Sequence, residues 1–128
     1  MSQHRSRLAI LLWAATPERP ELCATPFIHA MAAAALDCEV EVHFSGRASR
    51  LLITGEADQL FAAPGSTKSI YNFMREAANL GVRFIGCAMA LQANTREGES
   101  YIPEYAATAS ATDYVLRALD PEWATLVF

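Results

Sequence analysis

Short apolar runs alternate along the chain with segments that have helical spacing. Residues 8–15 are continuously apolar, which is typical of a strand covered on both faces in a parallel sheet. Residues 39–44 alternate strictly between polar and apolar, and predict a strand with one wetter face or a place near the sheet edge. Residues 82–87 predict a buried third strand. Residues 123–128 predict a final strand, buried in the sheet or at a subunit contact.

The segments between these strands carry apolar residues at helical spacing. Predicted helices cover residues 25–37, 66–80, 88–93 and 103–119. Residues 47–61 fit either a short strand or helical turns. Alternation of strands and helices predicts an α/β fold, a three-layer α/β/α sandwich around a mostly parallel five-stranded sheet. We expect residues 1–128 to form a single domain.

Composition narrows the function classes. The chain has 128 residues, of which 52% are hydrophobic and 19% charged, as in an ordinary globular protein. Ten basic and fourteen acidic residues give a net charge of −4 without a dense basic cluster, so nucleic-acid binding is not expected. The apolar run 8–15 is too short to cross a bilayer, and Pro17 and charged residues follow it. We therefore expect a cytoplasmic protein with no membrane partner.

The cysteine pattern points to a reducing compartment. Cys23, Cys38 and Cys87 form no C-x-x-C pair, and three cysteines make a disulfide framework improbable. A metal site drawn from Cys23, His29, Cys38 and His43 would match no zinc spacing, so ordinary structural roles are expected for the histidines. We expect no metal and no cofactor.

Cys87 is the candidate reactive residue. It follows a predicted strand and precedes a predicted helix, the point of a parallel α/β sheet where ligands usually bind. The positive end of a helix favours the thiolate there. The competing interpretation is a buried structural cysteine. Residue 90 is alanine, so a local redox partner is missing, and Ala93 stands where an anion-binding cysteine loop would often have arginine. No pattern in the sequence brings His29 or His43 to Cys87.

Three further residues are candidates for substrate binding at the same edge of the sheet. Arg47 and Arg50 follow the second predicted strand, and Cys23 lies in the loop after the first. The hypothesis is that the arginines favour an anionic group, such as a persulfide or thiosulfonate, beside the thiolate of Cys87. The competing interpretation is that both arginines are solvated surface residues.

The order of these elements resembles the DsrE/DsrF-like (DsrE/TusD-type) family of sulfur-relay proteins over residues 7 to 128. The stretches that carry the resemblance are Leu8–Trp13, Glu41–Gly46 and Leu80–Cys87, and the stretches Pro20–Phe27 and Asp120–Trp123 point to a subgroup. The resemblance implies a persulfide on Cys87, exchanged with TusA-like carriers or other sulfur-transfer proteins. It also implies a homotrimer or hexamer.

Three functions remain after these observations. We predict a cytoplasmic sulfur carrier or sulfurtransferase that holds sulfur on Cys87. The alternative is a non-enzymatic module that binds a small ligand or assembles with a partner, with Cys87 unmodified. A third possibility is a peroxide or redox sensor in which Cys87 pairs with Cys23. Thiol reactivity distinguishes the first two hypotheses. An inert Cys87 favours the binding module, whereas a rapidly labelled Cys87 favours sulfur chemistry.

Overall fold

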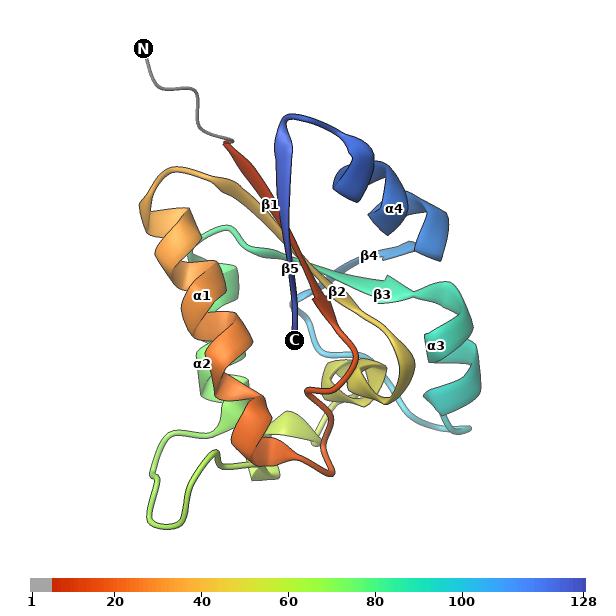
Figure 1. Cartoon of the computed structure of the whole chain (residues 1–128). Helices are drawn as coiled ribbons and strands as arrows, with labels where there is room; N and C mark the ends of the chain where they lie inside the picture. The colour runs from red at the N-terminus through yellow and green to blue at the C-terminus, as the bar shows by residue number, and fades with distance from the viewer. Residues whose placement is uncertain (1–5) are drawn as a thin grey trace.

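Five parallel strands form one sheet in the order β4-β3-β2-β1-β5 within residues 6–128, which the computed structural model describes (Figure 1). The strands are β1 (Arg7–Leu12), β2 (Glu39–Phe44), β3 (Arg83–Cys87), β4 (Tyr105–Ala109) and β5 (Trp123–Val127). The predicted α/β fold with a five-stranded, mostly parallel sheet is therefore confirmed.

Helices lie on both faces of the sheet. Helices α1 (Ala24–Ala35) and α2 (Ile70–Asn79) cover one face, and α4 (Ala111–Leu119) lies on the other (Figure 1). The short helix α3 (Ala88–Asn94) continues from the end of β3 and packs against η2 (Gly46–Leu52), a 3₁₀ helix. Two further 3₁₀ turns are η1 (Pro20–Leu22) and η3 (Ala57–Gln59). Within residues 6–128 no helix is both long and apolar enough to cross a membrane.

The main core lies between the sheet and the α1–α2 layer. Three fully buried rings meet there, because Phe44 and Phe84 stand on neighbouring strands and Phe27 reaches them from α1. Their centroids lie 5.4 to 6.1 Å apart. Burial of each ring contributes about 2 kcal/mol, so this cluster fixes α1 against β2 and β3.

Residues 105–109 correct one prediction. They lie within the predicted helix 103–119, which Pro103 was expected to open, but they form β4. Their backbone pairs with β3, where Cys87 registers with Ala109. The helix begins only at Ala111, since Ser110 forms a capping box with Asp113.

Smaller corrections concern element ends. β1 stops at Leu12 rather than running on to residue 15. Ser69, instead of Ser66 or Thr67, caps α2, and its side chain accepts from the amide of Asn72. Residues 51 and 52 belong to η2, and residue 53 forms only an isolated bridge.

Strand β2 was expected to have a wetter face or to lie near the edge, and this is wrong. It lies at the centre of the sheet between β1 and β3. Glu39 is exposed, but Glu41 and His43 on the same face are only 2% and 5% exposed. Helix α4 covers this face and supplies Arg117 as a partner for the buried carboxylate. The polar residues of β2 are therefore a buried polar cluster.

The final strand is an edge strand. Trp123 at its start is buried, as predicted, whereas Leu126 and Val127 toward its end are substantially exposed. Strand β5 pairs with β1 alone among the strands of residues 6–128.

Candidate functional site

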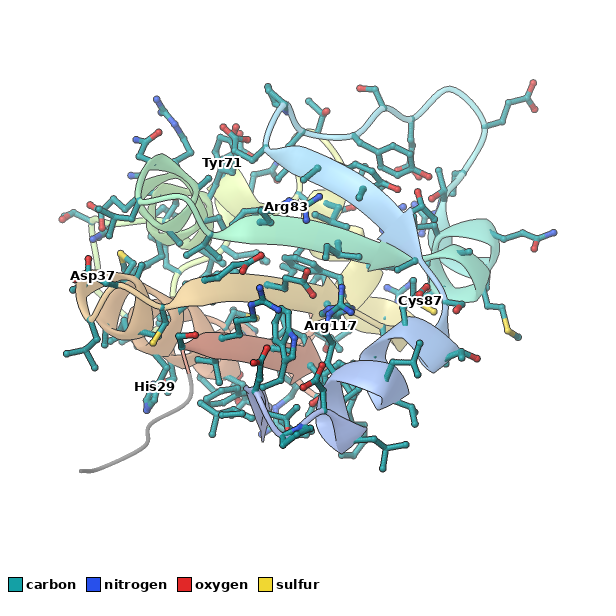
Figure 2. All side chains as sticks on the ribbon, turned by 90° about the horizontal axis from the view of Figure 1, so that it is seen from above. His29, Asp37, Tyr71, Arg83, Cys87 and Arg117 are labelled. Carbon is teal, nitrogen blue, oxygen red and sulfur yellow. The ribbon has the colours of Figure 1, made fainter. Side chains whose placement is uncertain are left out.

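Cys87 is the last residue of β3 and the N-cap residue of α3. The strand passes directly into the helix here, and Gly86 just before it lies close to neighbouring side chains. A Cβ on Gly86 would lie 2.6 Å from Cδ1 of Leu91 and 3.3 Å from Cδ1 of Leu52. Glycine thus lets α3 and η2 close against the strand end. Cys87 is left partly exposed at one end of the sheet, between α3 and α4 (Figure 2).

The Cys87 side chain lines a pocket of about 220 Å³ at the carboxyl edge of the sheet. The wall is largely apolar, with Leu11 from β1, Ala109 from β4 and Val115 from α4. Its polar members are His43, Ser45, Ser110 and Tyr114. A thiol in such a pocket is reachable by a small molecule while most of its surroundings exclude water.

His43 connects the buried polar cluster of β2 to this pocket. Its Nε2 lies 2.9 Å from Oε1 of Glu41, two residues earlier on the same face of β2. Arg117 donates to the same carboxylate from α4, with Nε 3.2 Å from Oε1 and a terminal nitrogen 3.4 Å from Oε2. The guanidinium of Arg117 also lies over the ring of Trp123, 4.7 Å from its centroid. Figure 2 shows Arg117 reaching across the sheet from α4.

Glu41 keeps its negative charge although it is buried. Burial raises the pKa of its carboxyl, but the hydrogen bonds from Arg117 and His43 outweigh burial and lower the pKa below its usual value. A carboxylate beside Nε2 holds the imidazole in one orientation. Tyr114 packs edge-on against the imidazole with ring centroids 5.3 Å apart, and burial raises the pKa of Tyr114.

Cys23 is placed away from this pocket. It is fully buried in the core on the α1 side of the sheet, and its thiol donates to the carbonyl oxygens of Thr16 and Arg19. Burial, with smaller contributions from Glu21 and Glu18, raises the pKa of Cys23 to about 12. A thiol in this state is a packed core residue, so the geometry gives no support for the substrate-binding role expected for Cys23.

The two arginines are also engaged elsewhere. The exposed Arg47 pairs with Glu18 at 2.6 Å and does not line the pocket. The buried Arg50 binds Glu56 and the two carboxylate oxygens of Glu99, and donates to the carbonyl of Asn94. Both guanidinium groups are thus neutralised by carboxylates. The structure brings Cys87 together with His43 rather than with the arginines.

Sequence reasoning missed His43 and Glu41 as members of the site. The strict alternation of residues 39–44, the run that ends before Ser45, placed both side chains on one face of the predicted strand. Only the pairing of β2 with β3 puts that face beside Cys87. Within residues 6–128 no three His, Cys, Asp or Glu side chains are grouped so that they could hold a metal ion.

Comparison with known proteins identifies the fold. No family model and no curated sequence matches the chain. Among solved structures, MTH1491 from Methanobacterium thermoautotrophicum, described as a protein of unknown function, superposes with a TM-score of 0.67 and 16% identity. The match covers 95% of this chain and 98% of that one. The ychN protein from E. coli superposes with a TM-score of 0.65 and 13% identity, over 98% of this chain and all of that one. Both neighbours have the DsrE-like fold, and the chain described here therefore shares it.

Proposed function

We propose that the protein is a sulfur carrier that holds a sulfane sulfur on Cys87 and passes it to a partner protein. The observation that carries the proposal is the position of the Cys87 thiol. It lies at the carboxyl end of β3, partly exposed, and opens into a mostly apolar pocket. A persulfide needs both an accessible attacking sulfur and shelter from competing thiols.

The transfer itself is an exchange between sulfur atoms. Cys87 attacks the sulfane sulfur of a donor, the donor thiolate leaves, and an acceptor thiol later removes the sulfur from Cys87 in the same way. The pocket wall is largely apolar, and Arg47 and Arg50 are paired with carboxylates outside it. This favours a persulfide donor over a thiosulfonate or another strongly anionic donor.

Mass spectrometry tests the proposal directly. The wild type and Cys87→Ser are incubated with a small alkyl persulfide, polysulfide, thiosulfate or tetrathionate, and intact masses and peptides are measured. A sulfur adduct on Cys87 that is released to an acceptor thiol supports the carrier. Cys38→Ser is the matched control, because Cys38 is also partly exposed and lies outside the pocket. A wild type that takes up sulfur from none of these donors would exclude the carrier.

A small-ligand binding module is the second candidate. Its supporting observation is the largely apolar wall of the pocket, which could hold an uncharged molecule without any reaction at Cys87. Adduct formation separates the two functions, since a binding module keeps an unmodified thiol while its ligand is bound.

The proposed carrier needs an acceptor, and the resemblance to the DsrE/DsrF-like family favours TusA-like carriers. The same resemblance favours a homotrimer or hexamer, which sedimentation of the purified protein would test. A cytoplasmic location belongs to the same proposal, because a reducing compartment keeps free cysteines from forming disulfides.

A further inference from the structure

We propose that His43 is the proton donor to the thiolate that leaves when Cys87 attacks a sulfur–sulfur bond, with Glu41 as its positioning residue. As a step of sulfur transfer this role rests on the proposed function. As a property of thiol exchange at Cys87 it can be tested by itself.

The sheet places the two side chains on one face. His43 registers with Ile85 on the neighbouring strand, and Cys87 follows two residues later. With strands about 4.8 Å apart and a rise of about 3.3 Å per residue, the two backbones are separated by about 8 Å. Both side chains line the same pocket. That separation leaves room for a donor sulfur between the thiol and the imidazole.

The orientation of the imidazole suits this role. Nε2 is the ring nitrogen that contacts Glu41, and Nδ1 makes no hydrogen bond within residues 6–128. Because the ring lines the pocket, its second nitrogen is available to a bound molecule. A carboxylate on one nitrogen and a reacting group at the other is the arrangement by which histidine works as an acid or base in cysteine and serine chemistry.

Several charged groups surround His43. Glu41 contacts it directly, and Asp113 on α4 is close enough to interact with its charge. The cations Arg117 and Arg83 contact the same Glu41 carboxylate, 3.2 and 3.8 Å from its oxygens. Tyr114 packs on the ring and stays neutral, because burial raises its pKa. The positive charges therefore hold the carboxylate in place while the carboxylate faces the histidine.

The proposed step balances without an oxidant. The Cys87 thiolate attacks the terminal sulfur of a donor R–S–SH, a Cys87 S–S bond forms, and the donor S–S bond breaks. The leaving R–S⁻ takes the proton from Nδ1 of His43, which gives R–SH, the Cys87 persulfide and neutral imidazole. In the return step an acceptor thiol gives its proton to Nδ1 and attacks the terminal sulfur. This releases the Cys87 thiolate and restores the imidazolium.

Two disulfides that differ in their leaving groups provide the test. Exchange at Cys87 is timed with 2-hydroxyethyl disulfide, whose alkyl thiolate needs a proton, and with 5,5′-dithiobis(2-nitrobenzoate), whose aryl thiolate leaves readily without one. Dividing the first rate by the second cancels the thiolate fraction of Cys87. We expect His43→Gln to lower this ratio by roughly 100-fold, the usual contribution of a general acid. His29→Gln is the matched control, since His29 is exposed on α1 and bonds only to its own helix.

The wild type supplies a second measurement that does not depend on the folding of a variant. Its ratio should fall as the pH rises, because an imidazole that has lost its proton cannot donate one to the leaving thiolate. In Glu41→Gln the ratio should be lower than in the wild type, because the imidazole loses the carboxylate that orients it. A ratio that is independent of pH in the wild type, or unchanged in a folded His43→Gln, would overturn the proposal. Sulfane loading of Cys87 is measured separately, so its failure would count against the carrier and not against the proton donor.

Discussion

The thiol of Cys23 donates to the carbonyl oxygen of Thr16 at 3.3 Å, and the Cys23 side chain is fully buried in the core. Cys87 instead lines an open pocket on the other face of the sheet. The two thiols therefore differ in access and in their neighbours, and the redox-sensor reading, which needs them to pair, gains no support from this geometry.

Thiol labelling should show this difference. At about pH 8, iodoacetamide should modify Cys87 at least about 100-fold faster than Cys23, because burial raises the pKa of Cys23 to about 12 and excludes the reagent. Peptide mass spectrometry at timed intervals measures both rates. In denaturant the difference should disappear, which serves as the control. Rapid labelling of Cys23 in the native protein would show that its core position is wrong.

The Arg50–Glu99 ion pair should influence how the free energy of unfolding changes at low pH. The side-chain hydrogen bond from Arg50, followed by the amide of Arg96, lowers the pKa of Glu99 from 4.5 to about 2. A carboxyl with a lower pKa in the folded state stabilises the fold fully above its unfolded value, and this stabilisation is lost as the pH falls through the folded value. The free energy of unfolding should therefore decline between about pH 4.5 and 2.

Chemical denaturation at a series of pH values measures this decline. Glu99→Gln should make it shallower, without abolishing it, because Glu41 and Glu18 also have lowered pKa values. Glu97→Gln is the control, since Glu97 is exposed on the same loop. Equal slopes for Glu99→Gln and the wild type would contradict the role of the Arg50 pair.

The strands that were predicted correctly carry their signal locally. The runs at 39–44 and 82–87 contain the β-branched and aromatic residues that favour strands, and glycine follows or precedes them. Residues 105–109 carry a weaker signal, because three of the five residues are alanine. Their strand state comes from pairing with the free side of β3, a contact that no local pattern encodes.

The candidate site was predicted in part for the same reason. A strand followed directly by a helix is visible in sequence, so Cys87 could be placed at the sheet edge. His43 joins it only through strand pairing and the cover provided by α4. Arg47 and Arg50 follow β2 as expected, but η2 turns them toward Glu18 and Glu99. The direction of these side chains is set by carboxylates that are far away in the sequence but in contact in the fold.

The buried carboxylate of Glu41 should make Arg117 important for stability. Arg117→Met keeps much of the side-chain length but leaves the buried Glu41 carboxylate with only His43 and the more distant Arg83 as partners. The free energy of unfolding should therefore fall by up to about 3 kcal/mol. Urea denaturation measures the change. The double variant Glu41→Gln/Arg117→Met removes the under-compensated charge and should recover part of the loss. Simple addition of the two single effects would show that the pair is not coupled.

Gly86 should control how closely α3 approaches the thiol. In Gly86→Ala the new Cβ would lie 2.6 Å from Cδ1 of Leu91, so the Leu91 side chain or α3 has to move. Overpacking of this kind costs about 1–3 kcal/mol. Because α3 starts directly after Cys87, the same displacement should also change the rate at which iodoacetamide labels Cys87.

A double variant separates this clash from other effects of alanine. Leu91→Ala alone should destabilise the protein, since Leu91 is buried and its removal leaves a cavity. In Gly86→Ala/Leu91→Ala the new methyl group enters space that the leucine has vacated. The combined loss in unfolding free energy should therefore be smaller than the sum of the two single losses, and the labelling rate of Cys87 should return toward that of the wild type. Strict additivity would place the effect of Gly86→Ala in the backbone, and would mean that the Gly86–Leu91 contact does not set the position of α3.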